Sequence, residues 1–216
     1  MPQQQRAIDT RRNALYGAAA VIDRRGYEAA TIAEMVQESN ITKGALYFHF
    51  SSKEAVAEAI VAEQGEWLSQ HLVDGDAPVQ SIVDLSYSFV DALRNDPLMR
   101  ASIRMTIDRA AQPEAIARGY GAWISTVESL LRKARRAGSL QSTVRPAACA
   151  YSLTSAMTGL QLTSDALTGR SDLPDRAEQF WRLVIPAIVR PELVGDIDVR
   201  PPARRTRRAR KATARV

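Results

Sequence analysis

Apolar residues recur along this chain with a period of about 3.6 residues, and no segment alternates with the two-residue period of a strand. Stripes of this kind, bounded by Gly, Pro and hydroxyl residues, predict helices near residues 7–25, 31–39, 42–50, 52–72, 80–94, 98–109, 113–137, 146–167 and 173–189. Pro186 predicts a kink or a break in the last of them. The sequence therefore predicts an all-α fold of about nine helices.

Two of these helices are too short to bury a stable face alone, and they make sense only as a pair. Thr31 can cap the first, Asn40 tolerates the left-handed backbone of a sharp turn, and Thr42 can cap the second. The second helix reads Lys-Gly-Ala-Leu-Tyr-Phe-His-Phe over residues 43–50. Two short crossed helices joined by a tight turn are typical of a helix-turn-helix, which places its second helix in the major groove of DNA.

Side chains around this pair provide the chemistry that DNA recognition needs. Hydroxyl and backbone donors at the starts of both helices can meet phosphates, and basic or aromatic side chains can reach base edges. Small residues in the second helix allow close approach to base edges and to thymine methyl groups. The predicted DNA-contacting residues are Thr31, Thr42, Lys43, Gly44, Ala45, Tyr47, His49 and Lys53.

Three segments, residues 23–28, 42–50 and 52–54, together resemble a known family. Residues 8–60 look like the N-terminal domain of TetR-family transcriptional regulators, and the string over residues 43–50 is similar to the γ-butyrolactone autoregulator receptor branch. The resemblance implies a homodimer built largely through the last two helices. Its two reading helices would enter successive major grooves of a pseudo-palindromic operator, about 34–36 Å apart. It also implies a small-molecule inducer.

A chain of 216 residues has room for one small and one larger domain. We expect a DNA-binding domain over residues 1–53, and a ligand-binding and dimerisation domain over residues 54–195. A basic tail that we expect to be disordered would cover residues 196–216, because it lacks periodic apolar positions.

The net charge of +5 is concentrated at the two ends of the chain. Without residues 200–216, which hold eight basic and no acidic side chains, 21 basic residues would face 24 acidic ones. Such an end would attract a polyanion. The tail is therefore either a solvated segment that aids solubility or an auxiliary contact to DNA.

Polar residues in otherwise apolar stripes predict a ligand site. Residues 146–164 carry no charge, which predicts a helix buried on all sides, although three Ser, three Thr and one Gln lie within it. Buried hydroxyls and amides need partners, and small-molecule pockets are mostly apolar with a few such groups. The predicted ligand-binding residues are Gln64, Tyr87, Thr106, Trp123, Val127, Tyr151, Thr154 and Thr158.

Each of these residues also has a structural interpretation. A Trp at helical spacing is usually part of the core, and Gln64 or Thr158 could equally form a hydrogen bond within the core. The resemblance favours Trp123, since receptors of the butyrolactone branch carry a ligand-contacting Trp in this helix. Trp123 matches it by position ahead of Val127.

Neither catalysis nor membrane insertion is supported by the sequence. There is no Gly-x-Ser-x-Gly motif, no Gly-rich phosphate loop and no Cys/His cluster, so we expect no enzyme activity, cofactor or metal. The single Cys149 and the absence of an apolar leader favour a reducing cytoplasm. The charge-free stretch over residues 146–164 is too polar for a membrane span.

The sequence thus favours a dimeric repressor that a γ-butyrolactone-like molecule releases from its operator. Two alternatives remain open at this point. A TetR-like repressor of antibiotics or other drugs would share the DNA-binding domain and differ in the pocket. An architectural DNA-binding protein would rely on the basic tail.

Overall fold

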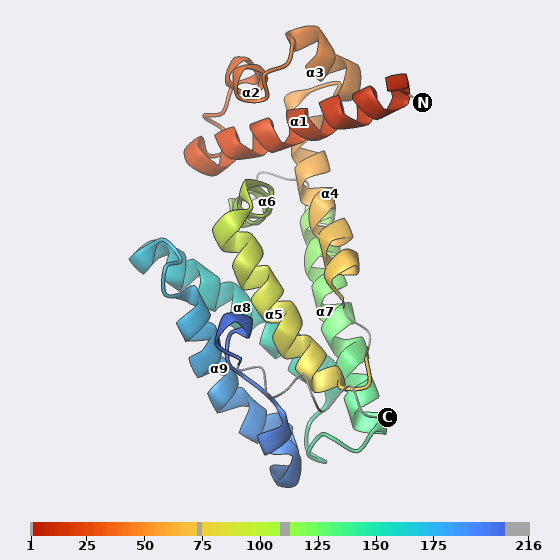
Figure 1. Ribbon diagram of the computed structural model, residues 1–216, viewed down its shortest axis with the longest axis vertical. Helices are drawn as coiled ribbons and strands as arrows, with labels where there is room; N and C mark the ends of the chain where they lie inside the picture. Colours follow the sequence, from red (N-terminus) through yellow and green to blue (C-terminus); the bar gives the residue numbers. More distant parts are fainter. Residues whose placement is uncertain (1, 73–74, 109–112, 206–216) are drawn as a thin grey trace. The chain divides into compact units, whose positions relative to one another are not determined.

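A computed structural model describes residues 2–72, 75–108 and 113–205, and these residues are mainly helical. In chain order the elements are α1 (Pro2–Arg25), α2 (Ile32–Glu38), α3 (Lys43–His49), α4 (Lys53–His71), α5 (Pro78–Asn95), α6 (Pro97–Ile107), α7 (Pro113–Arg136), α8 (Pro146–Thr168), α9 (Leu173–Ile188) and the 3-10 helices η1 (Pro191–Asp196) and η2 (Pro202–Arg204) (Figure 1). The one extended pairing among these residues is an isolated bridge between Leu140 and Val189. The all-α prediction is confirmed. The predicted helix boundaries agree closely, except that α1 begins about one turn earlier than expected.

Contacts divide the chain into two compact units. The first unit comprises residues 1–70 and 92–122, and the second comprises residues 71–91 and 123–216. Helices α5 and α7 therefore contribute one part to each unit.

In the first unit, α1 is the central element and packs against α2, α3 and α6. Its buried face meets Met35 of α2 and Leu46 of α3 in one apolar core, and both side chains are fully buried. Gly17 allows the close approach of α1 to the end of α2, since a Cβ at this position would lie 2.2 Å from the Ser39 Oγ. The three-helix arrangement follows from the apolar stripes and from this one glycine.

Helix α6 is fastened to the end of α1 by charged groups. The Arg100 Nε lies 2.7 Å from an Asp23 carboxylate oxygen, and Arg104 donates a hydrogen bond of 2.6 Å to the Asp23 carbonyl. Gly26 ends α1 with a positive φ of 80°, as expected for a glycine at a helix C-terminus. The first unit thus continues from the helix-turn-helix into α4 and α6.

The second unit is built around Trp181 of α9, which is 1% exposed. Its indole N–H donates a hydrogen bond of 2.8 Å to the Ser86 hydroxyl of α5, so its polar atom is satisfied within the core. Helices α8 and α9 pack on each other after a turn at Gly169, whose φ is 59°. Helix α9 runs through Pro186 and ends two residues later, at Ile188, so a break at this proline does not occur.

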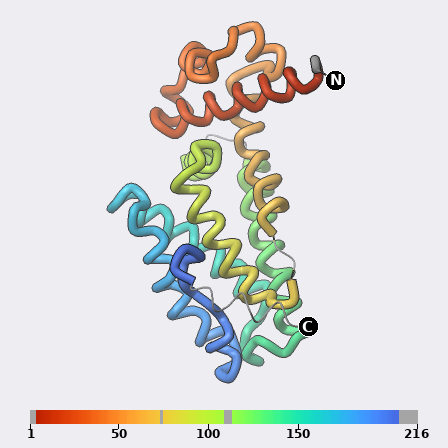
Figure 2. Tube along the Cα trace, in the orientation of Figure 1, coloured from red at the N-terminus to blue at the C-terminus, as the bar shows by residue number. Residues whose placement is uncertain are grey.

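A segment after α9, which we call the C-terminal strap (residues 197–205), folds back onto α5 (dark blue in Figure 2). Gln80 exchanges two hydrogen bonds with the Asp198 backbone, at 3.1 and 2.8 Å. Arg205 forms an ion pair of 2.6 Å with Asp84. The prediction that the disordered tail begins at residue 196 is therefore wrong, since long-range polar contacts hold the strap. Residues 206–216 lie outside the described part of the chain.

Helix α8 is not buried on all sides, contrary to the prediction. Tyr151 is 63% exposed and Leu167 is 74% exposed, while Ala150 and Gln161 are buried. The absence of charge from residues 146–164 therefore accompanies an uncharged surface of the single chain rather than complete burial. Such a surface is typical of a contact with another chain.

Candidate DNA-binding and ligand-binding sites

Caps at both helix starts fix the helix-turn-helix. Thr31 forms a capping box with Glu34, and the hydroxyl of Thr42 accepts a hydrogen bond of 3.1 Å from the Ala45 N–H. Asn40 has a φ of 50°, which confirms the predicted left-handed turn. Each local feature that the sequence suggested is present, and together they orient α3.

Helix α3 hides one face and exposes the other. Leu46 is fully buried and Phe50 is 4% exposed, whereas Tyr47 is 43% exposed and Phe48 is 80% exposed. The Lys43 Nζ lies 5.9 Å from the centroid of the Tyr47 ring on the exposed side. A short helix that presents a cation and two aromatic rings to solvent can reach base edges in a groove.

Some of the other predicted DNA-contacting residues are accessible, and one already forms contacts within the chain. Gly44 is open, because the nearest atom to a Cβ there would be 4.0 Å away, and His49 is half-buried. The Lys53 Nζ instead donates a hydrogen bond of 3.2 Å to the Glu28 carbonyl and lies 4.4 Å from the Tyr27 ring centroid. Lys53 is therefore committed to contacts within the chain.

Phe48 is the exposed residue of α3 that the sequence reasoning missed. It was assigned no role from the sequence, and its 80% exposure follows from the register that Leu46 and Phe50 impose. The helical spacing of those two anchors was the available signal.

The predicted ligand-binding residues do not form one cluster within either unit. Gln64 and Thr106 belong to the first unit, and the other six belong to the second. The Thr106 hydroxyl is satisfied by its own helix through a hydrogen bond of 2.8 Å to the Ser102 carbonyl. For Thr106 the structural interpretation is therefore sufficient.

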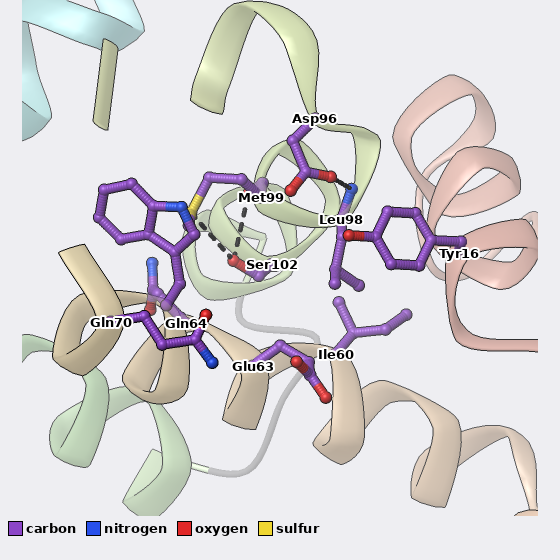
Figure 3. A pocket seen from close by; sticks show the side chains of 10 residues that line it. Tyr16, Ile60, Glu63, Gln64, Gln70, Asp96, Leu98, Met99 and Ser102 are labelled. Atoms are coloured by element: carbon purple, nitrogen blue, oxygen red, sulfur yellow. Dashed lines mark hydrogen bonds between the residues drawn. The ribbon is translucent and has the colours of Figure 1, made fainter. Parts of the chain in front are cut away.

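Gln64 lines a crevice of about 90 Å³ within the first unit (Figure 3). The crevice is lined by α1, α4 and the α5–α6 junction, through Tyr16, Ile60, Glu63, Gln64, Trp67, Gln70, Asp96, Leu98, Met99 and Ser102. Burial raises the pKa of Glu63, and the neighbouring Glu66 adds to this effect. Gln64 itself is 5% exposed.

In the second unit, Tyr87 contacts the C-terminal strap and Trp123 contacts another aromatic ring. Tyr87 is buried and donates a hydrogen bond of 2.6 Å to the Val199 carbonyl of the strap, and burial raises the pKa of its hydroxyl. Trp123 is half-buried, and its ring meets Phe89 edge to face with centroids 5.0 Å apart. Val127, one turn further along α7, is buried. The indole of Trp123 is thus packed on Phe89 and partly exposed.

The polar residues of α8 differ from one another in how they are satisfied. Thr158 donates a hydrogen bond of 3.0 Å to the Thr154 carbonyl, as a helical threonine commonly does. The Thr154 hydroxyl oxygen is buried and has no partner among the described residues. Tyr151 lies at the surface of the single chain, so only another chain could bury it. Gln161, which the predicted set omitted, is 1% exposed.

Comparison with known proteins agrees with this organisation. Residues 14–60 match the bacterial regulatory proteins of the tetR family, and residues 77–190 match the tetracyclin repressor-like C-terminal domain. The chain belongs to the TetR family. It is a ligand-responsive regulator that acts on operator DNA as a dimer.

Three relatives show how far the similarity extends. The A-factor receptor protein of Streptomyces griseus is 36% identical over 199 residues, which cover 91% of this chain and 70% of the relative. The crystal structure of TylP, a TetR regulator from Streptomyces fradiae, is 33% identical with a TM-score of 0.76 over 94% of each chain. A γ-butyrolactone receptor structure described as ArpA-like is 27% identical with a TM-score of 0.72, over 87% of this chain and 92% of that one.

Two further features limit the chemistry of the described residues. No helix among them combines the length and apolarity needed to cross a membrane. No group of three or more His, Cys, Asp or Glu side chains in the same residues is arranged to hold a metal ion.

Proposed function

We propose that this protein is a repressor whose operator binding is released by a γ-butyrolactone or a closely related small signalling molecule. The observation that carries this proposal is the 36% identity to the A-factor receptor protein over nearly the whole chain. The similarity to a γ-butyrolactone receptor structure supports the same class of ligand. We infer that the protein acts in the cytoplasm and is not an enzyme.

The DNA-binding face consists of α3 and the caps around it. Lys43 and Tyr47 supply an exposed donor and an exposed ring, and the open Gly44 allows the backbone to approach base edges. Thr31 and Thr42 start their helices where phosphates would sit. Phe48 adds apolar surface that can contact a thymine methyl group.

The ligand-binding site lies in the second unit and includes Trp123. An indole that is half-buried beside Phe89 can cover the apolar part of a lactone. Thr154 offers a hydroxyl without a partner in the described chain. The ligand must bind the released state more tightly than the DNA-bound state, because equal affinity would shift nothing.

A mobility-shift assay tests this proposal. Promoter DNA of the protein's own gene is compared with random DNA of equal length, each with and without added γ-butyrolactones. Specific binding that the lactone abolishes is the expected result. Release by antibiotics but not by lactones would favour a drug-sensing repressor instead. Equal, strongly salt-dependent binding to both DNAs would favour an architectural protein.

A further inference from the structure

Gln161 of α8 is a buried amide without a hydrogen-bond partner. The residue is 1% exposed, and neither its Nε2 nor its Oε1 has a partner in the part of the chain that the structure describes. The hydroxyl oxygen of Thr154, on the same helix, is also buried and unpartnered. Three polar atoms of one helix are thus removed from water, and no hydrogen bond from the described residues replaces those that water would form.

These atoms lie along one side of α8. Residues seven apart in a helix stand two turns and about 10 Å apart on nearly the same face. Thr158 lies between them and uses its own hydroxyl on the Thr154 carbonyl at 3.0 Å. The unpartnered groups therefore mark the two ends of a short polar row.

Two other buried polar groups of the second unit do have partners. Ser164 donates to the Asp172 carboxylate at 2.6 Å, and the Trp181 indole donates to Ser86 at 2.8 Å. Leaving an amide buried and unpaired costs free energy, and native proteins nearly always avoid it. A group from outside the chain would remove this cost.

The chemistry of the row restricts that group. The amide offers two donors and one acceptor, and the threonine hydroxyl offers a donor and an acceptor. Residues 146–164 contain no charged side chain, so this helix segment offers no counter-charge for a carboxylate or an ammonium group. A neutral hydroxyl, or a hydroxyl next to a carbonyl, matches both the donors and the acceptors.

We propose that Gln161 and Thr154 form a buried polar subsite that hydrogen-bonds a hydroxyl- or carbonyl-bearing part of the effector. This subsite rests on the proposed function, and it assigns the polar end of the ligand to α8. Gln161 then favours lactones that carry a side-chain hydroxyl.

The first test needs no ligand. Gln161→Met removes the unpaired amide while keeping an unbranched side chain of similar length. Without an effector, the variant should unfold at a temperature about 2–4 °C higher than the wild type. Gln37→Met, at an exposed glutamine of α2, is the matched control and should change little. A lower unfolding temperature for Gln161→Met would show that the amide is satisfied in the protein, which overturns the subsite.

The second test uses a pair of γ-butyrolactones that differ only in one side-chain hydroxyl. The wild type should bind the hydroxylated lactone at least about 10-fold more tightly than the deoxy lactone. Gln161→Met should bind the two equally, while Gln37→Met keeps the preference. An undiminished preference in Gln161→Met overturns the subsite although the proposed function stands.

A failure of the proposed function gives a different experimental result from a failure of the subsite. If neither lactone binds the wild type, the ligand class is wrong. A raised unfolding temperature of Gln161→Met would then still support an unpartnered amide awaiting another neutral ligand, and a lowered one would overturn the subsite.

Discussion

The helix-turn-helix and α8 differ in whether their polar side chains have hydrogen-bond partners. In the helix-turn-helix, Thr31 and Thr42 cap their helices, and the buried Ser39 hydroxyl is bonded to the Met35 carbonyl at 2.6 Å. In α8, the Thr154 hydroxyl oxygen and the Gln161 amide are buried and have no partner among the described residues. The surface that we propose for DNA binding has its capping groups satisfied internally, whereas the proposed ligand site leaves polar atoms open for a partner from outside the chain.

The largest expected effect tests the rigidity of the DNA-binding side. Gly17→Ala would place a Cβ 2.2 Å from the Ser39 Oγ, so α1 and α2 must separate. We expect a loss of about 3 kcal/mol or more in the free energy of unfolding, together with loss of operator binding. Urea unfolding measures the first and anisotropy of labelled operator the second.

Gly44→Ala is the matched control, because a Cβ there meets nothing closer than 4.0 Å. This helical glycine should gain stability as alanine, by roughly 0.5–1 kcal/mol. Equal stability of the two variants would contradict the close packing of α1 on α2.

A smaller effect is expected on the exposed face of α3. Lys43→Ala should lower operator affinity by about 10- to 100-fold while leaving helicity and dimerisation unchanged. Lys53→Ala serves as the comparison, since that ammonium group is held by the Glu28 carbonyl and should matter less to DNA. Near-normal operator affinity of Lys43→Ala would refute the assignment of the reading helix.

An effect of intermediate size is expected in the second unit when a contact of the C-terminal strap is removed. Tyr87→Phe removes the hydrogen bond of 2.6 Å to the Val199 carbonyl and should cost about 1 kcal/mol. The unfolding temperature should fall by about 2–4 °C. Tyr47→Phe, at an exposed ring of α3, should leave it unchanged, and an equal fall in both variants would argue against the strap contact.

The smallest expected effect concerns the end of α8. The Ser164 hydroxyl, then Thr168 and Arg176, lower the pKa of Asp172 to about 2. Because the folded pKa is lowered from an ordinary value of about 3.9, the stabilisation is complete above about pH 4 and is lost as the pH falls to about 2. The urea midpoints of the wild type and Asp172→Asn should therefore converge over this window. A constant difference would rule out this linkage.

Local signals explain why most of the fold could be predicted from the sequence. Caps at Thr31 and Thr42, the left-handed turn at Asn40 and the glycines after α1 and α8 are each set by a few neighbouring residues. Such features need no knowledge of distant contacts.

Features that depend on distant contacts were not predicted. The strap is held by pairs such as Gln80 with Asp198, which are 118 residues apart, so its composition alone suggested disorder. The charge-free residues 146–164 suggested burial, yet composition cannot say which sides of α8 the single chain covers. Gln161 belonged to the right stretch, but only the burial of its amide distinguishes it from Tyr151.

The most direct test of the proposed function is the response of Trp123→Ala to a γ-butyrolactone on operator DNA. Anisotropy of labelled operator is followed while the lactone is added to the wild type and to the variant, and thermal unfolding is measured on both. We predict that the variant binds operator with wild-type affinity and is not released by the lactone. Release of the variant at the wild-type concentration would contradict the account. Loss of operator binding together with easy unfolding would contradict it as well, because Trp123 would then be part of the core.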